Sequence, residues 1–387
     1  SRNYVSNVKE NGELVDTNKP ENTSTQSVTD LLKSAASFKD DEPKSPDDLW
    51  SSSAYPKGAN PAENVIRPKV DPKDTSIILF PGQGSQFVGM GKMLIDYPNV
   101  KEMFSIASDI LKYDLQKLCF EGPISELNKT SYCQPAILVT SLAAVEKLKV
   151  DKPQAVENCI ATAGFSVGEF SALVFADCIS FHDAISVMKV RAEAMQYASE
   201  IVPSGMMTVF FGADNRVNYA CCVAKQWCRK LGIENPECRI ANYLHPTCKV
   251  IAGNEEALQF IEMNAQDFGI RRLKRLAVSG AFHTDLMIPA EEPLKIALRK
   301  IKIKPPLINV HSNVDGKQYV DINHIYRGLI EQISSPVKWE QILHFLYERS
   351  QGTNYPETYE CGPGRQLTAI LKLVNGKAAA KCEHVKV

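Results

Sequence analysis

Charge imbalance and long apolar runs are both scarce in this sequence, and each shortage excludes a class of protein. The 44 Lys and Arg residues nearly balance 45 Asp and Glu, which leaves a formal net charge of −1. A nucleic-acid binder usually carries a basic excess, so nothing here supports that class. No apolar run approaches the ~20 residues of a membrane-spanning helix. We therefore expect no nucleic-acid partner and no membrane span.

Cysteine is present but lacks the pairing pattern of disulfide or zinc proteins. The eleven cysteines are an odd number, scattered through apolar segments. A secreted disulfide scaffold is shorter and denser in cysteine. The tightest cluster has no Cys-x-x-Cys pair, and helical packing explains it better than zinc does; it comprises Cys221, Cys222, Cys228 and Cys238. We expect free thiols in a reducing compartment and no metal site.

The first 74 residues differ from the rest. They are rich in Ser, Asn, Asp, Lys and Pro, with one short amphipathic piece at 28–36. This composition buries too little apolar area to offset the entropy of ordering, so we expect a flexible arm. The chain begins at Ser1 without Met or an apolar signal segment. Either a targeting peptide has been removed or the sequence has been cut, and the residues do not decide between these.

The rest of the chain predicts a large α/β domain interrupted by a small one. Apolar, β-branched runs predict strands at 76–80, 159–163, 307–312 and 358–360. Helices are predicted at 98–112, 123–129, 135–149, 169–176, 181–200, 286–300, 321–333 and 337–348, with another around Met90 and a last one after Gly364, before a Lys-rich tail.

The small domain is predicted from a change in the pattern of strands and helices that begins at Met206. Strands at 206–211, 239–243, 248–252 and 272–278 alternate with helices at 214–230 and 255–268. The order β-α-β-β-α-β is the ferredoxin-like split unit. We therefore predict an α/β-hydrolase-like domain with a parallel sheet over 75–203 and 279–387, and an inserted ferredoxin-like domain over 204–278.

Gly164-Phe165-Ser166-Val167-Gly168 is the most informative stretch. It follows an apolar strand and precedes a helix, which is the context of a nucleophile elbow. Small residues must flank the serine because the turn is tight. The helix N-terminus offers free N–H groups for a developing oxyanion. The alternative is a buried structural serine in an ordinary turn.

Two further loops follow strands and are candidates for chemistry. Gly82-Gln83-Gly84 resembles part of a dinucleotide fingerprint, but the third glycine and the acidic residue are missing at the required spacing. A serine nucleophile also needs a base, and the sequence has seven histidines. His283 lies in a loop at the junction of the two domains, a common place for a site. Spacing alone favours it only slightly.

Several motifs together resemble the malonyl-CoA:acyl carrier protein transacylases, and specifically their animal mitochondrial form. They occur in the family's order, cover about residues 75–375, and leave out the N-terminal arm. The motifs are Phe80-Pro-Gly-Gln-Gly-Ser-Gln86, Gln134-Pro-Ala, Gly164-Phe-Ser-Val-Gly-Glu169, Arg191-Ala-Glu-Ala-Met195, Gly280-Ala-Phe-His283, Ser335-Pro-Val-Lys-Trp339 and Gly362-Pro-Gly-Arg-Gln366. Many bacterial and polyketide-type relatives have His in place of Phe165, and the animal form has Phe.

The resemblance implies a role for each matching residue. Ser166 is the expected nucleophile and His283 the general base and acid, oriented by the backbone carbonyl of Gln332. Asp285 and Asp315 remain formal alternatives as orienting groups. The backbone N–H groups of Gln83 and Val167 are the expected oxyanion hole. Gln134 and Asn242 match polar positions that line the site.

Substrate choice is expected to rest on Arg191 and Phe282. The resemblance assigns Arg191 to the free carboxylate of malonyl, which a guanidinium binds bidentately. Without the resemblance, a surface arginine with a buried stem fits as well. A phenylalanine just before the histidine resembles the malonyl-selecting pattern, since the ring leaves no room for a branched acyl group. The alternative for Phe282 is a core aromatic.

The implied activity is malonyl transfer from coenzyme A to the phosphopantetheine thiol of acyl carrier protein, without metal or other cofactor. A serine hydrolase shares the elbow and the histidine but lacks Arg191 and the inserted domain. A non-catalytic descendant would be expected to lose Ser166 or His283. By resemblance we expect a monomer in the mitochondrial matrix that supplies fatty acid synthesis.

Clustered cations are candidates for docking the acidic carrier protein. One cluster lies at the domain junction and comprises Arg271, Arg272, Lys274 and Arg275. Another comprises Arg299, Lys300, Lys302 and Lys304. Charge runs more often form a solvated face, which is the alternative for both.

Overall fold

The structure is a computed structural model, and it describes residues 71–387 apart from 214 and 351. The predicted arm therefore lies almost wholly outside the described residues. Its last residues form a 3-10 turn, η2 (Pro72–Asp74), whose first N–H groups are capped by the carboxylate of Asp71 (Lys73 N to Asp71 Oδ1, 3.1 Å). Within the described residues, the first regular element thus starts at Pro72.

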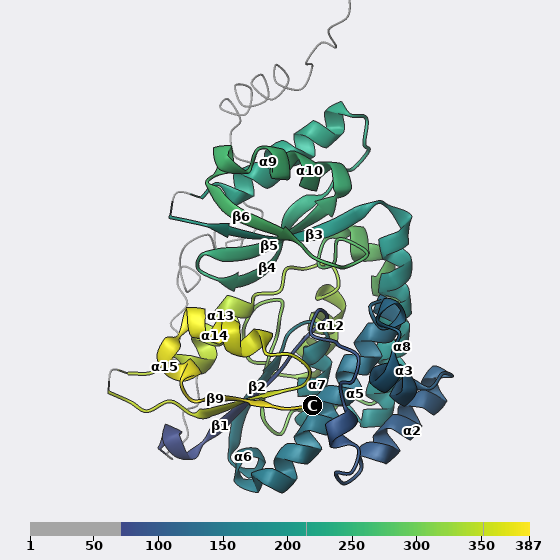
Figure 1. Ribbon diagram of the computed structural model, residues 1–387, viewed down its shortest axis with the longest axis vertical. Coiled ribbons are helices and arrows are strands. Elements are labelled where there is room, and N and C mark those ends of the chain that lie inside the picture. Colours follow the sequence, from purple (N-terminus) through teal and green to yellow (C-terminus); the bar gives the residue numbers. More distant parts are fainter. Residues whose placement is uncertain (1–70, 214, 351) are drawn as a thin grey trace, which may run out of the picture. The chain divides into compact units, whose positions relative to one another are not determined.

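A five-stranded parallel sheet forms the centre of the large domain (Figure 1). Its strand order is β7-β2-β1-β8-β9. The strands are β1 (Ser76–Phe80), β2 (Cys159–Gly164), β7 (Asn309–His311), β8 (Glu357–Cys361) and β9 (Cys382–Val385). All four pairings are parallel, as predicted for an α/β domain.

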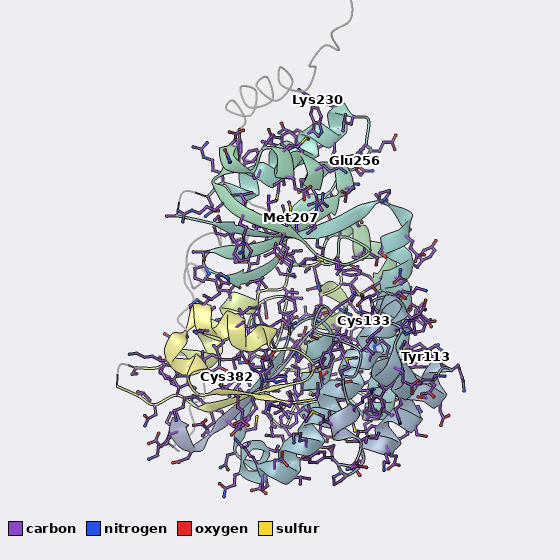
Figure 2. The ribbon with its side chains drawn as sticks, viewed as in Figure 1. Tyr113, Cys133, Met207, Lys230, Glu256 and Cys382 are labelled. Atoms are coloured by element: carbon purple, nitrogen blue, oxygen red, sulfur yellow. The ribbon has the colours of Figure 1, made fainter. Side chains whose placement is uncertain are left out.

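The Lys-rich tail, for which no element was predicted, has regular structure. It contains a short helix, α15 (Gly376–Ala379), and the edge strand β9, on which Cys382 lies beside β8 (Figure 2). Only four residues form this strand and three of them are partly or fully exposed. Neither an apolar run nor a clear alternation was available to predict it.

Helices cover both faces of the large sheet, and β1 shows how. Ile78 and Phe80 point into one core with residues of α5 (Thr130–Asp151) and α7 (Val167–Phe175). Ile77 and Leu79 point into a second core with residues of α13 (Trp339–Tyr347) and α14 (Gln366–Val374). A strand buried on both faces reads as a continuous apolar run, as Ser76–Phe80 does.

Some helix predictions were wrong in detail. No helix surrounds Met90; the chain there makes turns and the 3-10 helix η3 (Lys92–Leu94), since Gly89 and Gly91 have φ of 104° and 87°. The helix predicted from 135 starts at Thr130, so Pro135 is inside it. The other helices of this domain are α2 (Val100–Leu111), α3 (Leu115–Glu121), α4 (Ile124–Leu127), α6 (Pro153–Glu157), α8 (Phe181–Ile201), η5 (Asp285–Ala290), α11 (Glu291–Leu298) and α12 (Ile322–Glu331).

The inserted unit has the predicted β-α-β-β-α-β order. Its antiparallel sheet has the strand order β4-β5-β3-β6. The strands are β3 (Ser204–Phe211), β4 (Cys238–His245), β5 (Cys248–Asn254) and β6 (Ile270–Arg275); the helices are α9 (Val217–Lys230), α10 (Glu255–Met263) and η4 (Ala265–Phe268). Lys230 and Glu256 mark the two helices over one face of this sheet (Figure 2).

Loops of the large domain hold the small sheet close to the predicted site. Val337, in the chain between α12 and α13, donates its N–H to Ala241 O at 2.8 Å and accepts from Tyr243 N at 2.9 Å. Val337 therefore extends the small sheet at β4 as a parallel bridge to Asn242. In addition, the hydroxyl of Ser204 accepts from the N–H of Ala281 at 3.2 Å. Both ties involve segments that carry predicted site residues.

Candidate active site

Ser166 lies at the sharp turn between β2 and α7, as the elbow motif predicts. Its backbone has φ 52° and ψ −102°, a conformation that L-residues rarely adopt. The side chain is 7% exposed. Strain of this kind persists only where the surroundings over-determine it, and it is common at functional sites.

The two glycines of the motif are required by contact with neighbouring backbone. A Cβ on Gly164 would lie 1.8 Å from the carbonyl of Gly168, and a Cβ on Gly168 would lie 2.2 Å from Phe80 O. The first contact closes the turn, and the second packs α7 against the end of β1. Phe165 packs edge-on against Trp339, with ring centroids 5.5 Å apart, and so joins the elbow to α13.

Asn313 holds the turn and was missed from the sequence. Its Oδ1 accepts from the N–H of Ser166 at 2.7 Å, and its Nδ2 donates to Gly164 O at 2.7 Å. The side chain thus bridges both sides of the serine. A polar Asn directly after the strand predicted to end at 312 was the only available signal, because ligands gather at the carboxyl ends of parallel strands.

His283 is in contact with Ser166. Its Nε2 lies 2.9 Å from Ser166 Oγ, and its Nδ1 lies 2.7 Å from the carbonyl oxygen of Gln332. An N–H at Nδ1 donates to that carbonyl, which leaves Nε2 free to accept the serine proton. The formal alternatives have other partners: Asp285 pairs with Arg239, and Asp315 pairs with His324 at 3.2 Å.

Burial in this site favours neutral imidazole. Burial, reinforced by the Arg191 charge and opposed by hydrogen bonds to the backbone of Gln332 and Ser335, lowers the pKa of His283 to about 4. A neutral imidazole can act as a base at any pH above that value.

With acetyl-CoA, whose acyl group carries no charge, we expect kcat/KM to be independent of pH above about 6 and to fall in acid as His283 takes up a proton, since its pKa is about 4. The fold should weaken over the same range, because the unfolded histidine (pKa 6.5) binds the proton first. Circular dichroism at each pH separates the two effects. A midpoint near 6.5 in folded enzyme would contradict the assignment of His283 as a buried neutral base.

Arg191 is fully buried, so the interpretation as a surface arginine is wrong. It lies on α8 and donates from Nη1 to Gln134 Oε1 at 2.7 Å, and from Nη2 to Gln332 Oε1 at 2.7 Å and Ser166 Oγ at 3.2 Å. Its Nε has no hydrogen-bond partner among the described residues. Burial lowers its pKa to about 10, opposed by the charge of Glu169, so it remains a cation at neutral pH.

Glu169 is the second functional candidate that sequence reasoning missed. It was part of the quoted elbow motif but received no role. The carboxylate is fully buried and accepts from Tyr319 OH at 2.6 Å, from Asn313 N at 3.1 Å and from Gln332 Nε2. An acidic residue within the apolar first turns of a buried helix was the signal that could have identified it.

The expected oxyanion donors lie on the two loops that meet at the elbow. Val167 is the first residue of α7, where an N–H has no acceptor within the helix. Gln83 follows Gly82, and a Cβ on Gly82 would lie 2.4 Å from Phe165 O, so this loop runs against the turn. The side-chain amide of Gln83 donates to Thr130 Oγ1 at 3.3 Å. Their oxyanion role stays a prediction.

The other expected substrate contacts are buried. Gln134 holds Arg191 with Oε1, and its Nε2 is 3.5 Å from the sulfur of Met195. Asn242 is 6% exposed, and its Oδ1 has no hydrogen-bond partner among the described residues. Phe282 is 5% exposed and belongs to the larger apolar core. Its role in rejecting branched acyl groups stays a prediction.

The basic segment at the domain junction divides into one paired cation and three exposed ones. Arg275 is engaged by Glu255 (3.0 Å) and Glu262 (2.7 Å) on α10, so its charge is already neutralised. Arg271, Arg272 and Lys274 are exposed. The guanidinium of Arg272 lies 4.2 Å from the ring centroid of Phe210. Docking of a partner by the three exposed cations stays a prediction.

Two features that residues 71–387 (214 and 351 aside) lack bear on other functions. No helix there is long and apolar enough to cross a membrane. Within the same residues, no three or more His, Cys, Asp or Glu side chains are grouped so that they could hold a metal ion.

Comparisons with known proteins agree with this geometry. Residues 77–353 match the acyl transferase domain family. The chain is 52% identical over 327 residues to a Drosophila melanogaster protein named probable malonyl-CoA-acyl carrier protein transacylase, mitochondrial (84% of this chain, 86% of the relative). It is 53% identical over 307 residues to a Homo sapiens protein named malonyl-CoA-acyl carrier protein transacylase, mitochondrial (79% of each chain).

Solved structures show the same similarity. A malonyl-CoA:acyl carrier protein transacylase from Xanthomonas oryzae superposes with a TM-score of 0.72 and 30% identity, covering 81% of this chain and 95% of its own. A malonyl-transacylase in complex with a type II polyketide acyl-carrier protein superposes with a TM-score of 0.69 and 33% identity, covering 80% of this chain and 94% of its own.

Proposed function

The chain belongs to the acyl transferase family, among its malonyl-CoA–acyl carrier protein transacylases, and from this membership we propose how its residues perform the reaction. The reaction is transfer of malonyl from malonyl-CoA to acyl carrier protein. The observation that carries the mechanism is the chain of contacts from Gln332 O through His283 to Ser166 Oγ, with Arg191 at the same oxygen.

In the first half-reaction, Ser166 Oγ attacks the thioester carbonyl of malonyl-CoA. His283 Nε2 accepts the serine proton as the new C–O bond forms. The carbonyl oxygen becomes an oxyanion and is stabilised by the N–H groups of Val167 and Gln83. The C–S bond then breaks, and coenzyme A leaves as a thiol with the proton from His283.

The second half-reaction runs the same steps in reverse. The phosphopantetheine thiol of acyl carrier protein gives its proton to His283 and attacks the malonyl-serine ester. Ser166 leaves and recovers the proton. The carbonyl of Gln332 keeps the imidazole in one tautomer throughout, which is the role a carboxylate has in many serine enzymes.

Arg191 binds the free carboxylate of malonyl. In the unliganded site its donors are held by the amide oxygens of Gln134 and Gln332, which are neutral acceptors. A carboxylate forms stronger, charge-assisted hydrogen bonds with the same guanidinium. An acetyl group cannot do so and would leave the buried cation with weaker partners, a cost of a few kcal/mol, or ~10² in discrimination.

The serine hydrolase remains a disfavoured alternative. Both activities form the same acyl-serine, and they differ in whether water or a thiol removes it. The elbow is nearly closed to solvent, since Ser166 and His283 are 7% and 4% exposed. Exclusion of water protects the ester until the carrier arrives.

A location and an assembly state complete the proposal. The animal relatives are named mitochondrial, and we assign this protein to the mitochondrial matrix as a monomer that supplies malonyl units for fatty acid synthesis. Size-exclusion chromatography with light scattering tests the monomer, and a dimer mass would contradict it.

The proposed activity is tested directly by weighing the carrier. Enzyme, malonyl-CoA and holo-acyl carrier protein are mixed, and intact-mass spectrometry follows the carrier. We expect a mass gain equal to one malonyl group, which requires the enzyme. Free malonate without loaded carrier would instead support the hydrolase, and no gain above the enzyme-free control would contradict transfer.

Charge reversal tests the docking surface. We expect Arg272→Glu with Lys274→Glu to raise KM for acyl carrier protein severalfold, because both side chains are exposed cations and the partner is acidic. KM for malonyl-CoA should be unchanged. The matched variant reverses Lys300 and Lys302, in the other exposed basic cluster. Equal increases for both substrates would indicate general damage, and an effect only in the matched variant would move the docking site there.

A further inference from the structure

Glu169 occupies a position that only a carboxylate satisfies fully. The residue lies on α7, one turn after Ser166, and is buried completely. Its Oε1 accepts from Tyr319 OH (2.6 Å) and from Asn313 N (3.1 Å), while Oε2 accepts from Gln332 Nε2. The Asn313 donor is a backbone N–H and cannot become an acceptor. The surroundings therefore present three donors to two oxygens.

Gln332 connects this carboxylate to the reacting groups. Its Nε2 donates to Glu169 Oε2 and to Ser166 O (3.1 Å), and its Oε1 accepts from Arg191 Nη2 at 2.7 Å. Its backbone carbonyl separately accepts from His283. The side-chain amide thus sets the arginine, whereas the main chain sets the histidine.

The orientation of that amide depends on Glu169. An amide presents an oxygen on one side and an NH₂ group on the other, so a flip would direct two donors at Arg191, which has only donors. The acceptor at Glu169 Oε2 prevents the flip because it requires the NH₂ group on its own side.

We propose that Glu169 is a positioning residue for malonyl selection, which keeps the Gln332 amide oxygen directed at Arg191 and so aligns the guanidinium for the malonyl carboxylate. The inference rests on the proposed role of Arg191. It assigns Glu169 no direct contact with substrate. Because His283 is held by the Gln332 main chain, the loss of Glu169 should affect the choice of acyl group more than the chemistry on an uncharged one.

Glu169→Gln is the informative variant. The amide oxygen of the new glutamine satisfies Tyr319 and Asn313, so its NH₂ group faces Gln332 Nε2. The NH₂ group of the new glutamine and the NH₂ group of Gln332 are both donors and cannot pair. The Gln332 amide is therefore expected to flip, which turns its own NH₂ group toward the donors of Arg191. We expect the ratio of kcat/KM for malonyl-CoA to that for acetyl-CoA to fall about tenfold.

Two further variants serve as a weaker perturbation and as a control for the measured ratio. Tyr319→Phe removes one donor and should lower the ratio less, because the acceptor for Gln332 remains. Glu360→Gln is the matched control: Glu360 is also fully buried and accepts from Leu367 N (3.0 Å) and Thr368 N (2.8 Å), but it caps α14 and contacts neither Arg191 nor Gln332. It should lower stability and reduce both rates alike.

Protonation of Glu169 should have the same effect as the glutamine substitution. Burial raises its pKa to about 7, opposed by hydrogen bonds from Tyr319, Gln332 and Asn313 and reinforced by the charge of Asp315. The buried cation of Arg191 faces it across Gln332, and His283 is neutral there. When Glu169 Oε2 carries a proton, it becomes a donor that faces the NH₂ group of Gln332, as the amide of the glutamine variant does. In the wild type the malonyl-to-acetyl ratio should therefore fall as the pH drops through about 7, and in Glu169→Gln it should be low and constant.

The possible results distinguish a failure of the positioning role of Glu169 from a failure of the proposed role of Arg191. A wild-type enzyme without preference for malonyl contradicts the role of Arg191 itself. A wild type that prefers malonyl, with the full preference retained in Glu169→Gln, overturns the positioning role. A raised preference also overturns it, and would mean that Glu169 competes with malonyl for Arg191. A fall no larger than in Glu360→Gln would reduce Glu169 to a stabilising residue.

Discussion

Ser166→Ala is expected to abolish malonyl transfer, lowering kcat by a factor on the order of 10⁶, which is the cost of removing a serine nucleophile that acts with its histidine. The substitution removes the oxygen shared by His283 Nε2 and Arg191 Nη2 and adds no bulk. The variant should fold normally and bind malonyl-CoA, and it should gain no malonyl mass when the intact enzyme is weighed after exposure to malonyl-CoA.

Ser171→Ala is the matched control on the same helix. Ser171 is also buried, and its Oγ has no hydrogen-bond partner among the described residues, so its removal should leave kcat within about twofold of wild type. Accumulation of a malonyl-enzyme in Ser166→Ala would place the covalent intermediate on another residue. Loss of activity in both variants would indicate damage to α7 rather than to the nucleophile.

Arg191→Ala is expected to remove the preference for malonyl over acetyl, a loss of about 10² or more in relative kcat/KM. The guanidinium is the only cation in contact with Ser166 Oγ among the described residues, and its two hydrogen-bonded nitrogens face neutral amide oxygens, which leaves its positive charge for a carboxylate to pair with. Arg191→Lys should recover only part of the preference, because an ammonium cannot bind a carboxylate with a planar fork.

The measurement compares kcat/KM for malonyl-CoA and acetyl-CoA in each variant. Arg299→Ala is the control, since Arg299 is exposed at the end of α11 and donates to Tyr326 OH at 3.2 Å. It should leave the ratio unchanged. An unchanged ratio in Arg191→Ala would remove this residue from the acyl pocket and would leave Phe282 as the remaining specificity candidate.

The fold was predictable wherever burial gave a periodic signal. The strand at 76–80 is apolar at four of five positions because both of its faces are covered, and α8 matches its predicted span within one residue. The elements that failed lack such a signal. The edge strand β9 is short and partly exposed, and the turns around Met90 depend on glycines with positive φ in a stretch of helix-forming residues.

The site was predictable where a residue type is tied to a chemistry. A serine on an elbow indicates its role, whereas the resemblance was needed to choose His283 among seven histidines and supplied Arg191 and the Gln332 carbonyl. Glu169 and Asn313 were missed for a physical reason. They act through hydrogen bonds between segments 144 and 147 residues apart, and no local pattern encodes a partner at that distance.

The insertion of the small domain also sets an order in time. Ser166 lies 117 residues before His283 and 166 residues before Gln332, both of which contact it by hydrogen bonds in the folded protein. The nucleophile therefore leaves the ribosome well before its base and the carbonyl that orients that base. The nascent chain therefore carries an elbow serine without its proton acceptor while the 117 residues from Ser166 to His283 are added. Because chains are elongated at about 5–20 residues per second, this interval lasts several seconds or more. We therefore expect the nascent chain to be unreactive toward thioesters until the segment that carries His283 and Gln332 has been added.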